Sequence, residues 1–281
     1  MTLGREQLQW SDSVWKTIDD AVHDEFHRTA VGLKFIPFHS KADNAVNAPA
    51  DVVDLATMTI NEADVTPLVD LGIDFGLTRQ QTAVEEKNGT GVTLSTRAAN
   101  LLAQAEDLVI FLGETAFRNP LFKRVRRRGG TGGPGLLGSA VQSVPVEPVS
   151  QNTQRYGENS FRSIAEAYGH LQRQGHNGPY ALALHSDAYA DSLAPIANMP
   201  AVPADQIKQL ATLGMFGTGA LPPKTGVLVS VGGNSMDLVV GTEPTTEVLQ
   251  QDEEGFYRFR VFERFVLRVK DATAIVKLNF E

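Results

Sequence analysis

Residues 257 to 269 alternate between apolar and charged side chains with a period of two. One set of alternate positions, from Tyr257 to Val269, is apolar except for Glu263. The other set carries Arg258, Arg260, Arg264 and Arg268. This period predicts a β-strand with one buried face. At about 3.3 Å per residue the strand is roughly 43 Å long, which exceeds the usual strand of one compact core.

Apolar residues at helical spacing predict helices in the first two thirds of the chain. One helix begins at Ser11 or Ser13 and ends near Thr29. Its apolar stripe comprises Val14, Trp15, Ile18, Val22 and Phe26. A second runs from Ser95 to Leu112 and is followed by Gly113, a residue that favours the position after a helix. Shorter helices are predicted at 161–174, 187–193 and 207–213.

The last third of the chain is predicted to be mainly β-structure. Strands are expected at 226–231, 236–241, 257–269 and 274–280, after earlier ones at 33–38, 71–77 and 180–184. Strands and helices are mixed without regular βαβ alternation, so the sequence favours the α+β class.

Three segments lack a regular core pattern. Residues 40–72 are rich in Ala, Asp, Asn and Val, which indicates a mobile insertion or an extended arm that packs on a neighbour. Residues 118–138 are predicted to be a loop with a basic run and seven glycine-rich positions, 129–135. Residues 194–203 contain too many prolines for regular structure.

Composition narrows the classes of function. The net charge of −8 disfavours nucleic acid as the main partner. The chain has no cysteine, which excludes disulfides, thiolate catalysis and cysteine metal sites. The first ten residues are polar and no run of eighteen apolar residues exists, so we expect no signal peptide, no membrane partner and a cytoplasmic location.

The candidate catalytic groups form no recognisable constellation. His185, Ser186 and Asp187 are consecutive, and consecutive side chains of a strand point to opposite faces, so a turn is favoured over a triad. The glycine-rich loop lacks the Gly-Lys-Ser/Thr of a phosphate-binding loop. His23 and His27 lack a third metal ligand nearby. We therefore expect no enzyme activity and no metal site.

Four segments in order along the chain carry a family resemblance. They are Trp10-Ser-Asp-Ser-Val-Trp-Lys-Thr-Ile-Asp19, Ala105-Glu-Asp-Leu-Val-Ile-Phe-Leu-Gly113, Gln174-Gly-His-Asn-Gly-Pro-Tyr-Ala-Leu182, and the strands between 226 and 275. They resemble the opening helix, the Glu-Asp-x-x-Ile-Phe-x-Gly helix end, the Gly-Pro-Tyr strand entry and the carboxyl-terminal block of the encapsulin family. These linocin-type proteins form the shells of bacterial nanocompartments.

The resemblance implies the Hong Kong 97-type phage capsid fold, with a peripheral domain, an axial domain and an extended arm, the E-loop. Residues 1–39 would hold the N-terminal helix and the first part of the peripheral domain. Residues 40–72 would be the arm, which reaches a neighbouring subunit. The remaining ranges would be 73–134 for the peripheral domain with its spine helix, 135–222 for the axial domain, and 223–281 for the carboxyl-terminal β part of the peripheral domain.

The resemblance also implies a self-assembling icosahedral homo-oligomer that encloses a cargo enzyme. The cargo would be a dye-decolourising peroxidase or a ferritin-like iron-storage protein, held by its carboxyl-terminal targeting peptide. The peptide would lie in an apolar groove, which gives specificity through a few pockets. The matching positions are Trp15, Ile18, Val22, Phe26, Phe35, Phe38, Pro244, Thr246 and Val248. A pore loop would contain Pro195, Ala197, Asn198, Met199 and Pro200.

The chain departs from the family at two places. Many members have Asp-Leu-Ser-Ile-Gly-Tyr where this chain has Glu243-Pro-Thr-Thr-Glu-Val248. Some members stack a flavin on a Trp in the region where Gln80 stands here, so we expect no flavin and no other cofactor. Glu263 lies on an apolar face and needs a partner, so we expect it to pair with an arginine or a backbone donor.

Two other functions stay open at this point. A major capsid protein of a tailed phage or prophage would share the fold. A hydrolase or bacteriocin that uses His185 or Ser186 is the more distant alternative.

Overall fold

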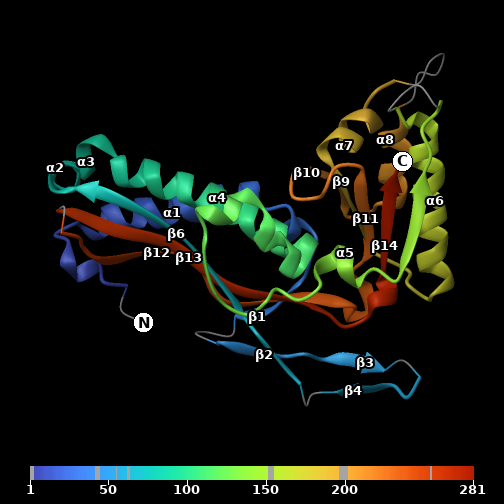
Figure 1. Ribbon diagram of the computed structural model, residues 1–281, viewed down its shortest axis with the longest axis horizontal. Coiled ribbons are helices and arrows are strands. Elements are labelled where there is room, and N and C mark those ends of the chain that lie inside the picture. Colours follow the sequence, from blue (N-terminus) through green and yellow to red (C-terminus); the bar gives the residue numbers. More distant parts are fainter. Residues whose placement is uncertain are drawn as a thin grey trace.

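Two packed bodies and a projecting arm make up the part of the chain that the computed structural model describes (Figure 1). The described residues are 3–41, 45–54, 56–61, 64–150, 155–195, 202–253 and 255–281. The bodies correspond to two separate hydrophobic cores. None of the helices in these ranges is long and apolar enough to cross a lipid bilayer.

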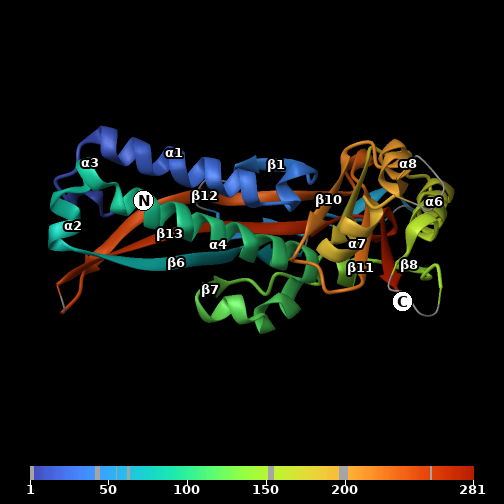
Figure 2. The same ribbon diagram turned by 90° about the horizontal axis from the view of Figure 1, so that it is seen from above.

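The first body is a five-stranded sheet covered on one face by two long helices (Figures 1 and 2). Its strands, in spatial order, are β1 Phe38–Lys41, β12 Met236–Gln251, β13 Phe256–Val269, β6 Val69–Thr78 and β7 Arg126–Gly129. The covering helices are α1 Asp12–Thr29 and α4 Thr90–Leu112. β13 pairs antiparallel with both β12 and β6, while β1 joins β12 in parallel.

The alternation along β13 divides its side chains between the two faces of this sheet. Phe259, Val261 and Phe265 are at most 1% exposed and belong to the core under the helices. The arginines on the other face pair with acids on the adjacent strands. Arg260 Nε lies 2.7 Å from Asp74 Oδ1, Arg264 Nη2 lies 3.2 Å from Asp70 Oδ2, and Arg268 Nε lies 2.7 Å from Asp237 Oδ1.

Each of these three arginines lies directly opposite its acid in the strand register. Cross-strand neighbours have Cβ atoms about 5 Å apart, so the pairing follows from the register itself. The predicted long strand is therefore confirmed, and its arginine face is neutralised within the sheet.

The second body is a mixed sheet with helices packed on it. Its strands, in spatial order, are β10 Gly214–Thr218, β9 Tyr180–His185, β11 Thr225–Ser230, β14 Ile275–Phe280 and β8 Gln142–Val146. The helices are α5 Gly135–Ser139, α6 Gly157–Arg173, α7 Ser186–Ser192 and α8 Pro203–Leu210. Because β11 and β14 belong to this sheet, the range 223–281 is shared between the two bodies rather than confined to the peripheral one.

The arm is a pair of two-stranded ribbons that projects from the first body (Figure 1). β2 Asn47–Pro49 pairs with β5 Val65–Pro67, and β3 Val52–Asp54 pairs with β4 Thr59–Asn61. Its apolar side chains are largely exposed, and Met58 reaches 79%. The arm lies where the sequence predicts one, and its contact with a neighbour stays a prediction.

Several boundaries differ from those predicted, because tertiary contacts decide them. α4 begins at Thr90 rather than Ser95, since the Glu85 carboxylate accepts hydrogen bonds from the N–H groups of Gly91 (2.7 Å) and Val92 (3.0 Å). The predicted strand at 33–38 is a 3-10 turn, and only its last residue enters a strand. The remaining short helices are α2 Arg79–Ala83, α3 Glu85–Asn88, η1 Arg5–Gln7, η2 Gly32–Lys34, η3 Gly113–Arg118, η4 Pro120–Lys123, η5 Gly232–Asn234 and η6 Ala272–Ala274.

A buried ion network fixes the base of the arm to the sheet. Asp237 and Arg268 side chains are each 2% exposed, and Lys270 Nζ lies 2.6 Å from Asp237 Oδ2. Arg268 also pairs with Asp51 and donates to the Pro49 carbonyl oxygen at 3.2 Å. Burial alone would raise the pKa of Asp237, but the hydrogen bonds and charges of its two cationic neighbours outweigh it and lower that pKa.

Replacing Asp237 with Ala should lower the free energy of unfolding by about 3–5 kcal/mol, because it leaves buried cations without a partner. Urea unfolding followed by tryptophan fluorescence measures this change. The matched control is Asp20→Ala, which removes an exposed pair with Lys16 and should leave the free energy of unfolding nearly unchanged. Equal losses in the two variants would contradict this account of the network.

Candidate functional site

The residues predicted to line a cargo groove lie mostly in the core. Trp15, Ile18, Val22 and Phe26 are between 0% and 7% exposed, and Phe35 is 5% exposed. The side chains of Thr246 and Val248 are also buried, at 0% and 4%. Of the nine positions, Phe38 (53% exposed) and the half-buried Pro244 offer side chains to an outside molecule. The helix stripe is thus a packing surface between α1, α4 and the sheet.

Along the outer edge of β12 the described strands leave a gap at residues 242–245, a range that includes Pro244. At one end β1 pairs with β12, from Phe38 opposite Leu238 to Lys41 opposite Val240. At the other end the Val248 N–H donates to the Leu3 carbonyl oxygen at 2.8 Å. Within the described ranges no strand pairs with this edge from 242 to 245, where the register of β12 is also shifted. A strand edge with which no described strand pairs is a place where an extended peptide can add to a sheet.

The rim of the gap carries ionisable groups from α1 and β12. Burial and the neighbouring His23 lower the pKa of His27, whereas Glu243 and Asp24 oppose this effect. The His23 and His27 rings are 4.2 Å apart between centroids. α1 itself carries five acidic and two basic residues. The carboxylates that act on His27 are therefore Glu243 on β12 and Asp24 on α1.

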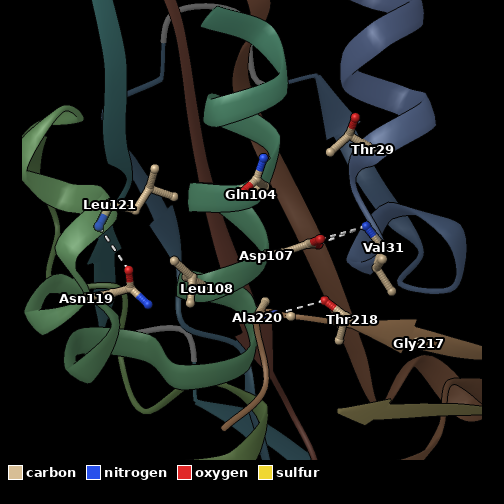
Figure 3. Close-up of a pocket in the computed structure, with 11 residues that line it drawn as sticks. Thr29, Val31, Gln104, Asp107, Leu108, Asn119, Leu121, Gly217, Thr218 and Ala220 are labelled. Carbon is tan, nitrogen blue, oxygen red and sulfur yellow. Dashed lines mark hydrogen bonds between the residues drawn. The ribbon is translucent and has the colours of Figure 1, made fainter. Parts of the chain in front are cut away.

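A cavity of about 340 Å³ lies where the two bodies meet (Figure 3). Asp107 on α4 lies at its wall and accepts hydrogen bonds from the N–H groups of Val31 (2.9 Å) and Gly32 (2.8 Å). Burial raises the pKa of Asp107 to about 6, although these two N–H groups act in the opposite direction. Asp107 therefore fixes the turn after α1 onto α4. Thr218 and Ala220 come from the second body.

Two buried glutamates lie in the core between α4 and β13: Glu106 on the helix and Glu263 on the strand. Glu106 and Glu263 are each 2% exposed, and neither Glu106 Oε2 nor Glu263 Oε1 has a hydrogen-bond partner in the described structure. Burial, followed by the charges of Glu106, Asp107 and Asp70, raises the pKa of Glu263 well above its ordinary value. Burial and Asp107 likewise raise the pKa of Glu106.

The sequence predicts that an arginine or a backbone donor pairs with Glu263. Glu263 Oε1 has no such partner in the described structure. The reason is the strand period: the arginines of β13 occupy the opposite face from Glu263. The Glu-Asp pair at 106–107 was visible in the sequence, but its proximity to Glu263 depends on a packing that joins positions far apart in the chain.

The other predicted positions are placed as follows. His185 ends β9, and its Nδ1 accepts a hydrogen bond from the Asp187 N–H at 3.3 Å, so it caps α7 rather than acting in a triad. No group of three His, Cys, Asp or Glu residues suited to a metal ion occurs among the described residues. Pro195 is exposed. Ala197, Asn198, Met199 and Pro200 lie outside the described residues.

Comparison with known proteins identifies relatives across nearly the whole chain. The model of a family described as encapsulating protein for peroxidase matches residues 1–120 and 131–266. The type 1 encapsulin shell protein EncA of Myxococcus xanthus is 32% identical over 188 residues, which cover 67% of this chain. The match spans 59% of the length of that relative.

Solved structures show the same fold at low identity. A virus-like particle from Pyrococcus furiosus matches with a TM-score of 0.68 and 18% identity, covering 94% of this chain and 99% of that one. The capsid of Myoviridae phage XM1 matches with a TM-score of 0.58 and 12% identity, covering 90% and 92%. The predicted α+β fold of the Hong Kong 97 capsid type is confirmed.

Replacing Glu263 with Gln should flatten the dependence of stability on pH. A carboxyl group with a raised pKa keeps its proton in the folded state after the unfolded chain has lost it. The free energy of unfolding of the wild type therefore falls as pH rises from the ordinary pKa of 4.5 to the raised value. Thermal melting across this pH range measures the effect. The melting temperature of the variant should rise relative to that of the wild type as the pH increases.

The exposed Glu114 provides the control for this measurement, because Glu114→Gln removes a carboxyl group without changing the core. It should leave the shape of the pH profile unaltered. A Glu263→Gln profile parallel to the wild type would contradict the raised pKa.

Proposed function

The chain belongs to the family of encapsulating proteins for peroxidase, and we propose that it assembles with copies of itself into a closed icosahedral shell around a cargo enzyme. The relative from Myxococcus xanthus is a type 1 encapsulin shell protein, which favours this function over a phage capsid. The shell is proposed to be cytoplasmic and to contribute enclosure rather than catalysis.

The observation that carries self-assembly is the exposed apolar surface of the arm. Single exposed apolar residues are normal, but a cluster on a projecting ribbon indicates an interaction site. The ion network at Arg268 anchors the base of the arm. The far part of the arm extends away from the core (Figure 1). In a shell, a second copy of the chain would be the partner that covers this apolar surface. The exposed arm residues are Val46, Val52, Met58, Ile60 and Val65.

The gap on β12 supports the enclosure of a partner by means of an extended tail. Backbone groups of an incoming strand would supply affinity, and the exposed Phe38 with Pro244 would select its side chains. The cargo proposed from the family is a dye-decolourising peroxidase or a ferritin-like iron-storage protein. Its carboxyl-terminal peptide would occupy the gap between β1 and the N-terminal segment.

Purified protein should elute as a megadalton particle rather than as a species of 30.4 kDa. Met58→Asp should lower the yield of particles at least about tenfold, because it buries an unpaired charge in every copy of the arm contact. Light scattering and electron microscopy measure this yield. Met58 is exposed in the subunit, so the melting of unassembled protein should not change.

Thr59→Asp is the matched control, since it adds the same charge at an exposed polar position of the same ribbon. A wild-type protein that stays at the mass of one subunit would overturn the proposed function. Normal particles from Met58→Asp would instead remove the arm from the assembly contact.

A fluorescent reporter that carries the carboxyl-terminal tail of an enzyme encoded beside the shell gene should be enclosed on co-expression. Phe38→Asp should lower the number of reporters per particle about tenfold or more, because it places a charge where an apolar side chain docks. Thr17→Asp, at an exposed position of α1, should leave loading unchanged. Equal loading in the two variants would exclude Phe38 from the tail site.

A further inference from the structure

The N-terminal segment of the chain lies along the same edge of β12, directly after the gap. The Leu3 carbonyl oxygen accepts from the Val248 N–H at 2.8 Å. The Arg5 guanidinium donates to the Thr246 carbonyl oxygen through Nη2 (3.0 Å) and Nε (3.3 Å). The Gln7 side chain donates to the Leu249 carbonyl oxygen at 3.3 Å. Residues 3–7 therefore contact the β12 edge at 246–249, directly after the gap at 242–245.

Arg5 is held by three kinds of group at once. Its Nη1 and Nη2 atoms lie 2.8 Å and 2.6 Å from the two carboxylate oxygens of Asp19. Its guanidinium carbon lies 4.6 Å from the centre of the Trp15 ring. The Thr246 carbonyl completes the set. A carboxylate fork, an aromatic face and a carbonyl acceptor together recognise a planar guanidinium better than they recognise an ammonium.

The backbone of the segment is closely fitted to the strand. Gly4 has a φ of +66°, and a Cβ atom at this position would lie 2.2 Å from the Val248 carbonyl oxygen. Leu3 and Leu8 are half-buried on either side. Residues 5–7 form the 3-10 turn η1, so the segment holds the strand edge through one backbone hydrogen bond and the side chains of Arg5 and Gln7 rather than as an added strand.

We propose that residues 3–7 are an intramolecular occupant of a peptide-binding edge on β12. Asp19, Trp15 and the Thr246 carbonyl form an arginine subsite that Arg5 fills. A basic residue of an incoming tail competes with Arg5 for this subsite. The part that concerns a cargo tail rests on the proposed function. The subsite is continuous with the gap, so a tail seated at 242–245 reaches it within a few residues at about 3.3 Å each.

Covalent attachment gives the N-terminal segment an advantage over any free peptide. A short tether holds its ligand at an effective concentration in the millimolar range. A tail that binds only the gap therefore gains nothing from the subsite, whereas a tail with a well-placed arginine can displace the segment. Terminal segments open at lower free energy than core strands, which makes such exchange accessible without unfolding. The segment thus sets an affinity threshold for loading.

The test uses the chain's own sequence as the probe. A fluorescent reporter that ends in residues 1–8 of this protein is co-expressed with the wild-type shell and with a shell that lacks residues 1–7. Reporters per purified particle are then counted. We expect at least about tenfold higher loading in the truncated shell, because the competing segment is absent. Changing the Arg of the reporter tail to Ala should remove at least about tenfold of that loading.

A second measurement does not depend on truncation or on assembly. Hydrogen exchange at the Val248 N–H reports directly on its bond to Leu3. Arg5→Ala should speed this exchange at least about tenfold, since it removes the contacts with Asp19, Trp15 and Thr246. Glu6→Ala is the matched control, because Glu6 is exposed in the same segment. It should leave the exchange at Val248 unchanged.

Three results would overturn the proposal: equal loading of wild-type and truncated shells, no loading of the truncated shell, or loading that ignores the tail arginine. Failure of the proposed function is recognised separately, because no particle forms in that case. Hydrogen exchange on the unassembled protein then still decides whether Arg5 holds the segment in place. Equal exchange in Arg5→Ala and Glu6→Ala would reject that role.

Discussion

The central position of β13 is the constraint on which the rest of the structure depends. This strand is paired on both edges, by β12 and by β6, and both of its faces are covered or charged. Every polar side chain on it must therefore find a partner within the sheet or lie next to the core. The arginines meet this demand through acids placed opposite them in register. Glu263 instead lies next to the core, where burial and the nearby carboxylates raise its pKa.

The same strand also connects the two bodies. The chain leaves the second body after β11, runs outward through β12, returns through β13 and re-enters the second body as β14. Two continuous strands thus link the cores, and Asp107 joins the turn after α1 to α4 beside the cavity at the same boundary.

Much of this architecture follows from local patterns. The period of two locates β13, and the period near 3.6 locates α1 and α4, because burial of one face decides each of these elements. The start of α4 was missed because its cap is the carboxylate of Glu85, which lies outside the pattern of the helix. Composition left residues 40–72 as a mobile insertion or an extended arm, since the segment lacks the apolar spacing of a core element, and the family resemblance favoured the arm.

The sites were harder to predict, because they depend on groups that the chain brings together from far apart. The same apolar stripe on α1 is compatible with a core and with a groove; in the subunit it packs against α4 and the sheet, and the groove stays a prediction. The gap on β12 lies between the residues paired by β1 and those held by the N-terminal segment, two elements far apart along the chain from β12. Neither Arg5 nor Asp19 carries a pattern that indicates their pairing.

The two unpartnered glutamates in the core have a thermodynamic consequence of their own. Between the ordinary pKa of 4.5 and the raised value, the folded subunit holds protons that the same carboxyl groups release once water reaches them. Unfolding is then coupled to proton release into the solvent. The heat absorbed by a melting shell includes the heat of protonating the surrounding buffer, so the apparent enthalpy differs between buffers of different ionisation heat although the protein is the same.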